Sequence, residues 1–295
     1  MIEIFRDIEQ FKIFRSNLDE KIKRSGQTHT IGLVPTMGNL HRGHLSLVQR
    51  SLDSHETTIV TIYVNPKQFS PNEDFEKYPR TLKLDIAQLR PLLEKTNKSL
   101  VIFAPATNSD IYPIDFETQI GVGRLADKLC GAKRTGHFDG VCTVVHRLFI
   151  ITRPHSAYFG QKDYQQFLII KRMVQDLEMA INIFLCPTQR DKLGLAYSSR
   201  NQFIKKDEIN DALDLANTIK NLKEILENSP WSQVKKEVNS LVESKLKDKS
   251  WDYLEVLDSM NLKAPDADTQ IMVIAGAKYL SATRLIDNKL VEVPC

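Results

Sequence analysis

The chain has 295 residues, of which 42% are hydrophobic and 26% are charged, as is typical of a folded globular protein. The formal net charge of +3 is too small to favour a nucleic-acid-binding or membrane-binding surface. Residues 1–7 carry acidic side chains and no apolar signal core, and no apolar run is long enough to span a bilayer, so we expect a cytoplasmic protein. The cysteines lack zinc-site spacing, and we expect reduced thiols at Cys130, Cys142, Cys186 and Cys295.

Hydrophobic periodicity predicts strands that alternate with helices over about the first 186 residues. The strands are expected at Thr30–Val34, Thr57–Val64, Leu100–Ala104, Ala157–Phe159 and Ile181–Cys186, with a weaker one at Gln119–Val122. The helices are expected at Ile8–Arg24, residues 45–53, Thr81–Leu93, Leu125–Cys130, Val141–Ile151 and Tyr164–Leu177. Apolar, β-branched strands suit a parallel sheet covered on both faces. The predicted fold class is therefore α/β, with a Rossmann-like doubly wound parallel sheet.

The pattern changes near Thr188, where the alternation ends. Two helices are expected at Asp207–Asn228 and Val234–Leu246, followed by strands at Trp251–Leu257, Ile271–Ala275 and Ser281–Leu285. We therefore predict a Rossmann-like domain over residues 1–187 and a smaller C-terminal α+β domain over residues 188–295.

The stretch Pro35–His44 lies between a predicted buried strand and a predicted helix. A strand, a glycine-bearing turn and a helix N-terminus present backbone N–H groups to an anion. His41 and His44 flank Gly43, and an imidazolium donates hydrogen bonds to phosphate oxygens. The spelling His-x-Gly-His resembles the nucleotide-binding signature of nucleotidyltransferases and class I aminoacyl-tRNA synthetases. The alternative is a pair of turn histidines that cap a loop.

Two further stretches carry polar side chains that suit an acidic substrate. Asn65 and Gln68 follow a predicted strand and offer uncharged donors and acceptors to a hydroxyl or carboxylate, although Asn65-Pro66 is also an ordinary turn dipeptide. The stretch Gly131–Gly140 combines glycines with basic side chains, and it is interpreted either as a mobile loop that grips phosphate or carboxylate or as a solvated linker.

Two later stretches suit phosphate and ribose. Lys162 can place a point charge on phosphate, and Asp163 can accept from ribose hydroxyls or cap the following helix. The stretch Tyr197–Asn201 combines hydroxyls with a guanidinium, as an oxyanion grip or as a helix N-cap.

Taken together, these stretches closely resemble the pantothenate synthetase (pantoate–β-alanine ligase) family. The resemblance runs from about Leu33 to Asn288, nearly the whole chain, with the motifs in the family's order. The matching residues are Val34–Gly38, His41, Gly43, His44, Val64–Pro66, Gln68, Phe69, Asn72–Asp74, Tyr78–Thr81, Gly136–Phe138, Gly140, Val141, Tyr158–Gly160, Lys162, Asp163, Gln165, Gln166, Arg172–Val174, Asp176, Leu177, Gly194–Ala196, Ser198–Asn201 and Thr283–Asn288.

The resemblance implies an ATP-dependent condensation of pantoate with β-alanine through a pantoyl adenylate, releasing AMP and pyrophosphate. It implies catalytic roles for His44 as proton donor and for His41, Lys162 and Arg200. It implies that residues 1–187 bind nucleotide and pantoate and that residues 188–295 close over the ATP site. The implied ATP-binding residues are Pro35, Met37, Gly38, Asn39, Leu40, His41, Arg42, Gly43, His44, Gly160, Gln161, Lys162, Asp163, Gln189, Tyr197, Ser198, Ser199 and Arg200.

The implied pantoate and β-alanine residues are Gln68, Gln166, Asn65 and Tyr78, with Arg134 near phosphate. Mg²⁺ is expected on the triphosphate, bound mainly by phosphate oxygens and water. Asp85 and Gln88 are the protein groups that would help to hold it. The expected partners are pantoate, β-alanine, ATP and a second copy of the chain in a homodimer, with no nucleic acid and no membrane.

The sequence departs from the family pattern at Thr135, Leu193, Gln189 and Tyr197. Thr135 replaces a proline and Leu193 an aspartate, while Gln189 and Tyr197 lie where the family contacts adenine. Two other functions remain open. One is another adenylate- or cytidylate-transferring enzyme of the same superfamily, which need not have Asn65, Gln68 or Gln166. The other is a noncatalytic nucleotide sensor on the same fold, which would bind ATP without releasing pyrophosphate.

Overall fold

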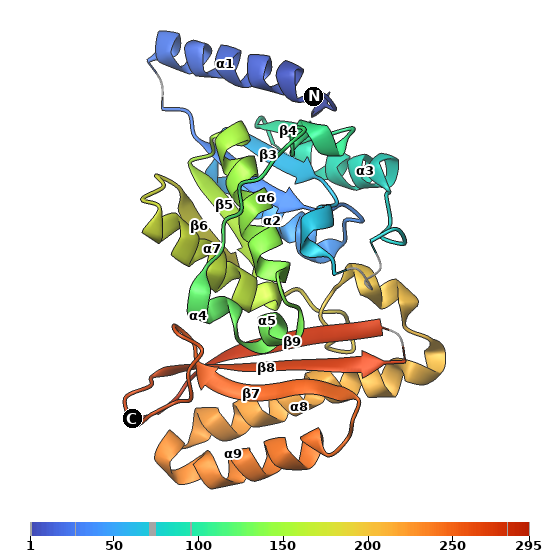
Figure 1. Cartoon of the computed structure of the whole chain (residues 1–295), viewed down its shortest axis with the longest axis vertical. Helices are drawn as coiled ribbons and strands as arrows, with labels where there is room; N and C mark the ends of the chain where they lie inside the picture. The colour runs from blue at the N-terminus through green and yellow to red at the C-terminus, as the bar shows by residue number, and fades with distance from the viewer. Residues whose placement is uncertain (1, 27, 71–74, 95, 282, 295) are drawn as a thin grey trace. The chain divides into compact units, whose positions relative to one another are not determined.

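The computed structural model describes residues 2–26, 28–70, 75–94, 96–281 and 283–294, so the motif Asn72–Asp74 and Cys295 lie outside the described residues. The chain divides into two compact units, Met1–Gly160 with Gln165–Cys186, and Gln161–Tyr164 with Pro187–Cys295. Figure 1 labels their elements.

The first unit is built on a six-stranded parallel sheet in the order β1-β4-β3-β2-β5-β6 (Figure 1). Its strands are β1 (Ile2–Phe5), β2 (Ile31–Thr36), β3 (Thr57–Ile62), β4 (Ser99–Phe103), β5 (Ser156–Gly160) and β6 (Asn182–Cys186). The strand β2 lies between β3 and β5, so the strand order reverses there. Ligands of open α/β sheets bind outside the carboxyl ends of the strands at such a switch point.

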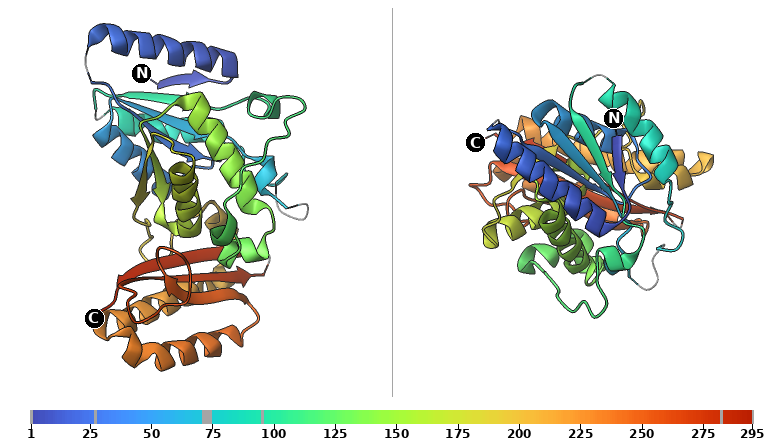
Figure 2. Two further views of the ribbon diagram at one scale, coloured as in Figure 1. Left: turned by 60° about the vertical axis from the view of Figure 1, so that its left-hand side comes forward. Right: turned by 90° about the horizontal axis from the view of Figure 1, so that it is seen from above.

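Helices cover both faces of this sheet, as Figure 2 shows. Helices α2 (Arg42–Ser54) and α3 (Leu82–Leu93) pack with side chains of β2, β3 and β4 in one buried cluster. On the other face, α1 (Ile8–Ser25) stacks Phe11 on Phe103 of β4 at 4.4 Å between ring centroids and contacts α6 (His137–Thr152). The last helix of the unit is α7 (Tyr164–Asp176). The predicted doubly wound parallel sheet is confirmed.

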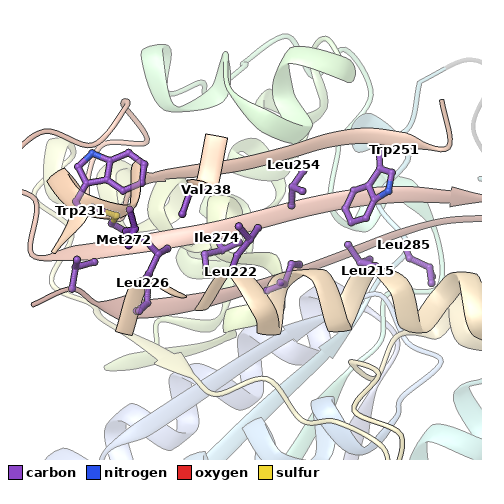
Figure 3. Packing of buried hydrophobic residues seen from close by; sticks show 14 of the residues in the cluster. Leu215, Leu222, Leu226, Trp231, Val238, Trp251, Leu254, Met272, Ile274 and Leu285 are labelled. Carbon is purple, nitrogen blue, oxygen red and sulfur yellow. The ribbon is translucent and has the colours of Figure 1, made fainter. Parts of the chain in front are cut away.

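The second unit is a small α+β structure. Its antiparallel sheet consists of β7 (Trp251–Asp258), β8 (Ile271–Leu280) and β9 (Thr283–Glu292). Helices α8 (Ile209–Asn228) and α9 (Trp231–Leu246) pack against it. Figure 3 shows their shared core, in which leucines of α8 meet Trp231, Trp251 and Met272. The antiparallel C-terminal sheet confirms the predicted α+β part of the fold class.

Three details differ from the sequence-based prediction. The stretch Gln119–Val122 is not a strand; it bonds to α6 instead, with the Ile120 amide donating to Thr143 Oγ1 at 3.0 Å. The predicted loop Gly131–Gly140 is largely helical, because α5 (Leu129–Lys133) and α6 enter it from either side. The predicted helix Leu125–Cys130 is split between α4 (Gly123–Ala126) and α5.

Single turns of 3-10 helix occur in the connections: η1 (Pro66–Gln68), η2 (Asn108–Asp110), η3 (Gln161–Asp163), η4 (Ser199–Phe203) and η5 (Lys206–Glu208). None of the helices in the described ranges combines the length and the hydropathy that a membrane crossing needs.

Candidate active site

The turn after β2 is shaped by backbone conformations that few residues adopt. Gly38 has φ +84°, and a Cβ there would come within 3.2 Å of Asp85 Oδ2 and 3.1 Å of Ile62 Cγ2. Asn39 also has a positive φ, of 49°. The Thr36 hydroxyl donates to the Thr61 carbonyl at 2.8 Å and accepts from the Gly38 amide at 3.1 Å. The turn therefore requires glycine at position 38 and is anchored to the end of β2.

Side chains of helix α3 bond to the backbone of the same turn. Asp85 is fully buried, and its carboxylate accepts from the backbone amides of Leu40 at 2.7 Å and Asn39 at 3.2 Å. The Thr81 hydroxyl also donates to it, and one helical turn later Gln88 Nε2 donates to the Leu40 carbonyl at 3.1 Å. Asp85 and Gln88, predicted as metal-binding groups, thus hold both backbone groups of Leu40.

The two histidines of the turn lie at the start of α2. His41 is the N-cap residue, and its Nδ1 accepts from the Gly43 amide at 3.2 Å, which places the proton of the neutral ring on Nε2. The rings of His41 and His44 stack at 3.9 Å between centroids. Arg42 is the first residue of α2, and Pro35 lies within β2 opposite Thr61.

The loop after β3 brings the predicted acid-binding glutamine against this turn. Gln68 Nε2 donates to Met37 Sδ at 3.1 Å, and Gln68 Oε1 accepts from Asn65 Nδ2 at 3.1 Å. The two strands β2 and β3 are neighbours, with Thr36 opposite Ile62, so both loops leave the same edge of the sheet. The side chains predicted to bind the acid and the nucleotide are therefore in contact.

Asn65 is buried, with only 1% of its surface exposed, and its side chain bonds to several segments. Its Nδ2 also donates to the Gly140 carbonyl at 3.0 Å, and its Oδ1 accepts from the Tyr112 hydroxyl at 2.8 Å. Burial raises the pKa of the Tyr112 hydroxyl above its usual range, so the phenol stays a proton donor at ordinary pH. At position 140 any Cβ would lie 2.1 Å from the Lys67 carbonyl oxygen, so only glycine permits this close approach.

The start of α6 holds the backbone of Gln68. Arg134 Nη1 donates to His137 Nε2 at 3.0 Å, and His137 Nδ1 in turn donates to the Gln68 carbonyl at 2.7 Å. Arg134 Nη2 also donates to that carbonyl at 3.4 Å. Because a guanidinium only donates, His137 is the neutral Nδ1–H tautomer in this arrangement. Arg134, predicted beside phosphate, here supports the Gln68 loop.

The remaining predicted residues of the first unit lie on α7, beside Phe69 and at the end of β5. Gln166 on α7 is half-buried. Its neighbour Gln165 is buried and ties α7 to the residues before α5, with Nε2 donating to the Leu125 and Lys128 carbonyls. Tyr78 packs its ring edge-on to Phe69 at 6.0 Å between centroids. Gly160 ends β5, paired with Cys186.

In the second unit, the segment Gln161–Asp163 forms the turn η3 before α7. Lys162 is mostly shielded from solvent, with 18% of its side chain exposed, and its Nζ lies 3.4 Å from Asp163 Oδ1. Asp163 is exposed. A lysine and an aspartate side by side offer a cation to a phosphate and an acceptor to a hydroxyl.

The segment from Gln189 to Arg200 is a hairpin-like turn of the same unit. The Gln189 carbonyl accepts from the Tyr197 amide at 3.0 Å, and Arg190 bridges to Ala196. Ser198 caps η4, accepting from the Arg200 amide at 3.2 Å, as the N-cap interpretation predicts for this stretch. Asp191 Oδ1 accepts from the Leu193 and Leu195 amides, so the turn at Leu193 is capped without an aspartate there.

The described residues offer neither a metal cluster nor an activated thiol. No group of three or more His, Cys, Asp or Glu side chains among them is placed to hold a metal ion. Burial raises the pKa of the Cys142 thiol to about 12, and Cys130 and Cys186 are also buried. A thiol that stays protonated is a poor nucleophile, so Cys142 does not favour covalent catalysis.

Several residues that hold the predicted side chains in place were not predicted in that role. Asp85 is predicted as a metal-binding group, His137, Asp287 and Asn288 lie in matching motifs, and Tyr112 has no predicted role. Tyr112, His137 and Asp85 support the turns of the first unit, and Asp287 and Asn288 of β9 do the same in the second unit. The signal for Asp287 and Asn288 is their place in the stretch Thr283–Asn288, which matches the family.

Comparison with known proteins identifies the family to which this chain is similar. The sequence model of the family described as "Pantoate-beta-alanine ligase" matches residues 3–290. A pantothenate synthetase of Thermotoga petrophila is 42% identical, covering 98% of this chain and 99% of its own length, and one of Clostridium novyi is 44% identical over 88% of this chain and 90% of its own.

Solved structures give the same result. A crystal structure of pantothenate synthetase from Thermus thermophilus superimposes with a TM-score of 0.83 at 33% identity, covering 97% of this chain and 98% of that one. The pantoate–β-alanine ligase of Francisella tularensis, described as complexed with β,γ-ATP and β-alanine, gives a TM-score of 0.73 at 33% identity over 98% of both chains.

Proposed function

This chain belongs to the pantoate–β-alanine ligase family, and from that premise we propose how its residues carry out the reaction. The chain is an ATP-dependent ligase that condenses pantoate with β-alanine to pantothenate, releasing AMP and pyrophosphate. The observation that carries the proposal is the contact between Gln68 and Met37, at 3.1 Å. It joins the loop that would bind the acid to the turn that would bind the nucleotide.

In the first step, a carboxylate oxygen of pantoate attacks the α-phosphorus of ATP, and the bond to the β-phosphate breaks to release pyrophosphate. Both histidines of the turn donate to the phosphates: neutral His41 donates from Nε2, and His44 acts as the proton donor. Preorganised donors of this kind stabilise charge that develops in the transition state. Lys162 and Arg200 supply further cations, and the backbone from Met37 to His44 lines the nucleotide.

In the second step, the amine of β-alanine attacks the carbonyl carbon of pantoyl adenylate. The bond between that carbon and the AMP oxygen breaks, and the amine loses a proton to solvent. Gln68 and Gln166 hydrogen-bond the hydroxyl and carboxylate groups of the acid, and Tyr78 and Arg134 border the same pocket. Asn65, predicted to bind the acid, is buried with all of its polar atoms bonded within the protein, so it holds Gln68 in place instead. A free carboxylate is a poor acyl donor because its oxygen is a poor leaving group. Adenylation makes AMP the leaving group, and the amine can then form the amide bond.

We propose that Mg²⁺ arrives with ATP, held mainly by phosphate oxygens and water. Asp85 does not fit as its direct ligand in this conformation, because the carboxylate is fully buried and accepts from two backbone amides and a hydroxyl. We therefore assign no step to the metal through Asp85 or Gln88. The resemblance also leads us to propose a cytoplasmic homodimer, which light scattering of the purified protein tests.

The assignment is tested by measuring AMP formation from ATP with pantoate and a panel of amines. We expect AMP with pantoate and β-alanine, and much less when the amine is glycine or when a hydroxyl-free acid replaces pantoate. Nucleotidyl transfer to an unrelated acceptor would instead identify another enzyme of the superfamily. Binding of ATP without any pyrophosphate release would identify a nucleotide sensor.

A further inference from the structure

The segment that carries Lys162 belongs to the second unit, although the chain on either side of it belongs to the first. Residues Gln161–Tyr164 lie between β5 and α7 in sequence but cluster with Pro187–Cys295. The Tyr164 hydroxyl, buried, donates to the Ser259 carbonyl at 3.0 Å and fixes the end of the segment. Side chains distant in sequence therefore determine where this short turn lies.

Asn288 on β9 holds the middle of the segment. Its Nδ2 donates to the carbonyls of Gln161 and Lys162, both at 2.8 Å, and Gln161 Nε2 donates back to Asn288 Oδ1 at 3.5 Å. A primary amide nitrogen has two N–H donors, and both are used on consecutive carbonyls. Asn288 is 4% exposed, so these bonds lie away from water, where losing a partner is most costly.

The preceding residue orients the other predicted nucleotide segment of this unit. Asp287, 3% exposed, accepts two hydrogen bonds from Arg190, at 2.6 and 2.8 Å. Arg190 also donates to the Gly194 carbonyl at 3.0 Å, across the turn that leads to Tyr197. Adjacent residues of one strand thus support the turn of Lys162 and the turn before Arg200.

We propose that Asn288 is a positioning residue that sets Lys162 for the phosphates of ATP. The inference rests on the proposed function, because it takes Lys162 as a phosphate-binding cation. The two carbonyl contacts flank the Lys162 Cα, so they fix the peptide units from which its side chain projects. No other residue type of similar size supplies two donors in this geometry; aspartate supplies none, and serine supplies one.

The test is a double-mutant cycle with Asn288→Ala and Lys162→Ala, read by kinetics and by nucleotide binding. We expect Asn288→Ala to lower kcat/KM for ATP about tenfold while the KM for pantoate changes less than twofold. In the Lys162→Ala background, adding Asn288→Ala should lower kcat/KM for ATP by less than a further factor of two. The matched control is Asn217→Ala, which removes an exposed asparagine of α8 and should match the wild type.

Binding separates this inference from the proposed reaction. Asn288→Ala should weaken MgATP binding about tenfold and leave adenosine binding within twofold, because Lys162 acts only on the phosphates. This readout is valid even if the wild type forms no AMP, a result that would refute the proposed function alone. The role of Asn288 would be overturned if Asn288→Ala weakened the binding of MgATP and of adenosine equally. It would also be overturned if the loss of kcat/KM in the double variant equalled the product of the losses in the two single variants.

Folding is checked by thermal unfolding of each variant. If Asn288→Ala does not fold, Asn288→Ser, which retains one donor, takes its place in the cycle. The losses in kcat/KM for ATP and in MgATP affinity are then expected to be about threefold, half of tenfold on a logarithmic scale. Failure of both variants to fold would show that Asn288 is purely structural and would overturn the inference.

Discussion

The turn after β2 and the turn after β5 hold their predicted phosphate-facing side chains by different means. The turn from Met37 to His44 is fixed by its own backbone, by Thr36 and by α3, all within residues 36–88. The turn of Lys162 is fixed by Asn288, which lies 126 positions later in sequence. The first is a local structure that its sequence nearly determines, and the second is assembled only when the C-terminal unit folds.

The difference explains what the sequence could predict. The strands and helices of the sheet, and the turn with His41 and His44, follow from apolar runs and short motifs that act locally. The strand order and the partners of the loop after β3 do not, because His137 reaches the Gln68 carbonyl and Tyr112 reaches Asn65 only through the folded sheet. The stretch Gly131–Gly140 is predicted as a loop from its glycines and charges, whereas tertiary contacts make most of it helical.

The largest effect is expected at His44. Replacing His44 with alanine removes a cationic donor at the phosphates from a turn whose backbone is held by other residues. Loss of one such donor typically costs about 2.7–4 kcal/mol of activation free energy, roughly a 10²–10³-fold fall in kcat. Pyrophosphate release by the purified variant measures it. A folded His44→Ala enzyme with a rate within twofold of the wild type would remove His44 from the mechanism.

An intermediate effect is expected at Asp85, which holds the backbone of the same turn. Asp85→Asn keeps the shape of the side chain but replaces one acceptor oxygen with an N–H₂ group that points at a backbone N–H donor. A buried polar group is then left unpaired, at a cost of about 1–3 kcal/mol. We expect the free energy of unfolding to fall by this amount in urea titrations, and kcat/KM for ATP to fall as well. Asp53→Asn, at an exposed position on α2, is the control.

The Mg²⁺ dependence of the Asp85→Asn variant separates a role in the turn from a role in metal binding. If Asp85 acts on the turn and not on the metal, the Mg²⁺ concentration for half-maximal activity stays within twofold of the wild type. A tenfold rise in that concentration, with unchanged unfolding, would instead make Asp85 a metal ligand.

The smallest effect is expected far from the nucleotide turn, at His55. This side chain bonds to Thr30 Oγ1 at 2.8 Å and to the Tyr158 hydroxyl at 2.9 Å, and burial lowers its pKa below the usual 6.5. As the pH falls below about 6.5, His55 binds a proton in the unfolded chain but stays neutral in the folded protein. The free energy of unfolding therefore decreases until the pH reaches the pKa of His55 in the folded protein.

Urea unfolding between about pH 5 and pH 8 measures this slope. We expect His55→Gln to show a shallower loss of stability on acidification than the wild type. Part of the slope should remain, because burial also lowers the pKa of His29. Parallel curves for the two proteins would show that His55 does not contribute. The adenylation rate per folded enzyme at pH 8 should be unaffected.

The central claim is that the first step needs only ATP and the acid, bound by the turn after β2 and the loop after β3. Rapid-quench measurement with labelled ATP, Mg²⁺ and pantoate, in the absence of β-alanine, tests it directly. We expect a burst of about one pyrophosphate per site, with AMP released only after β-alanine is added. Pyrophosphate that appears only after the addition of β-alanine would contradict the two-step adenylate mechanism for this protein.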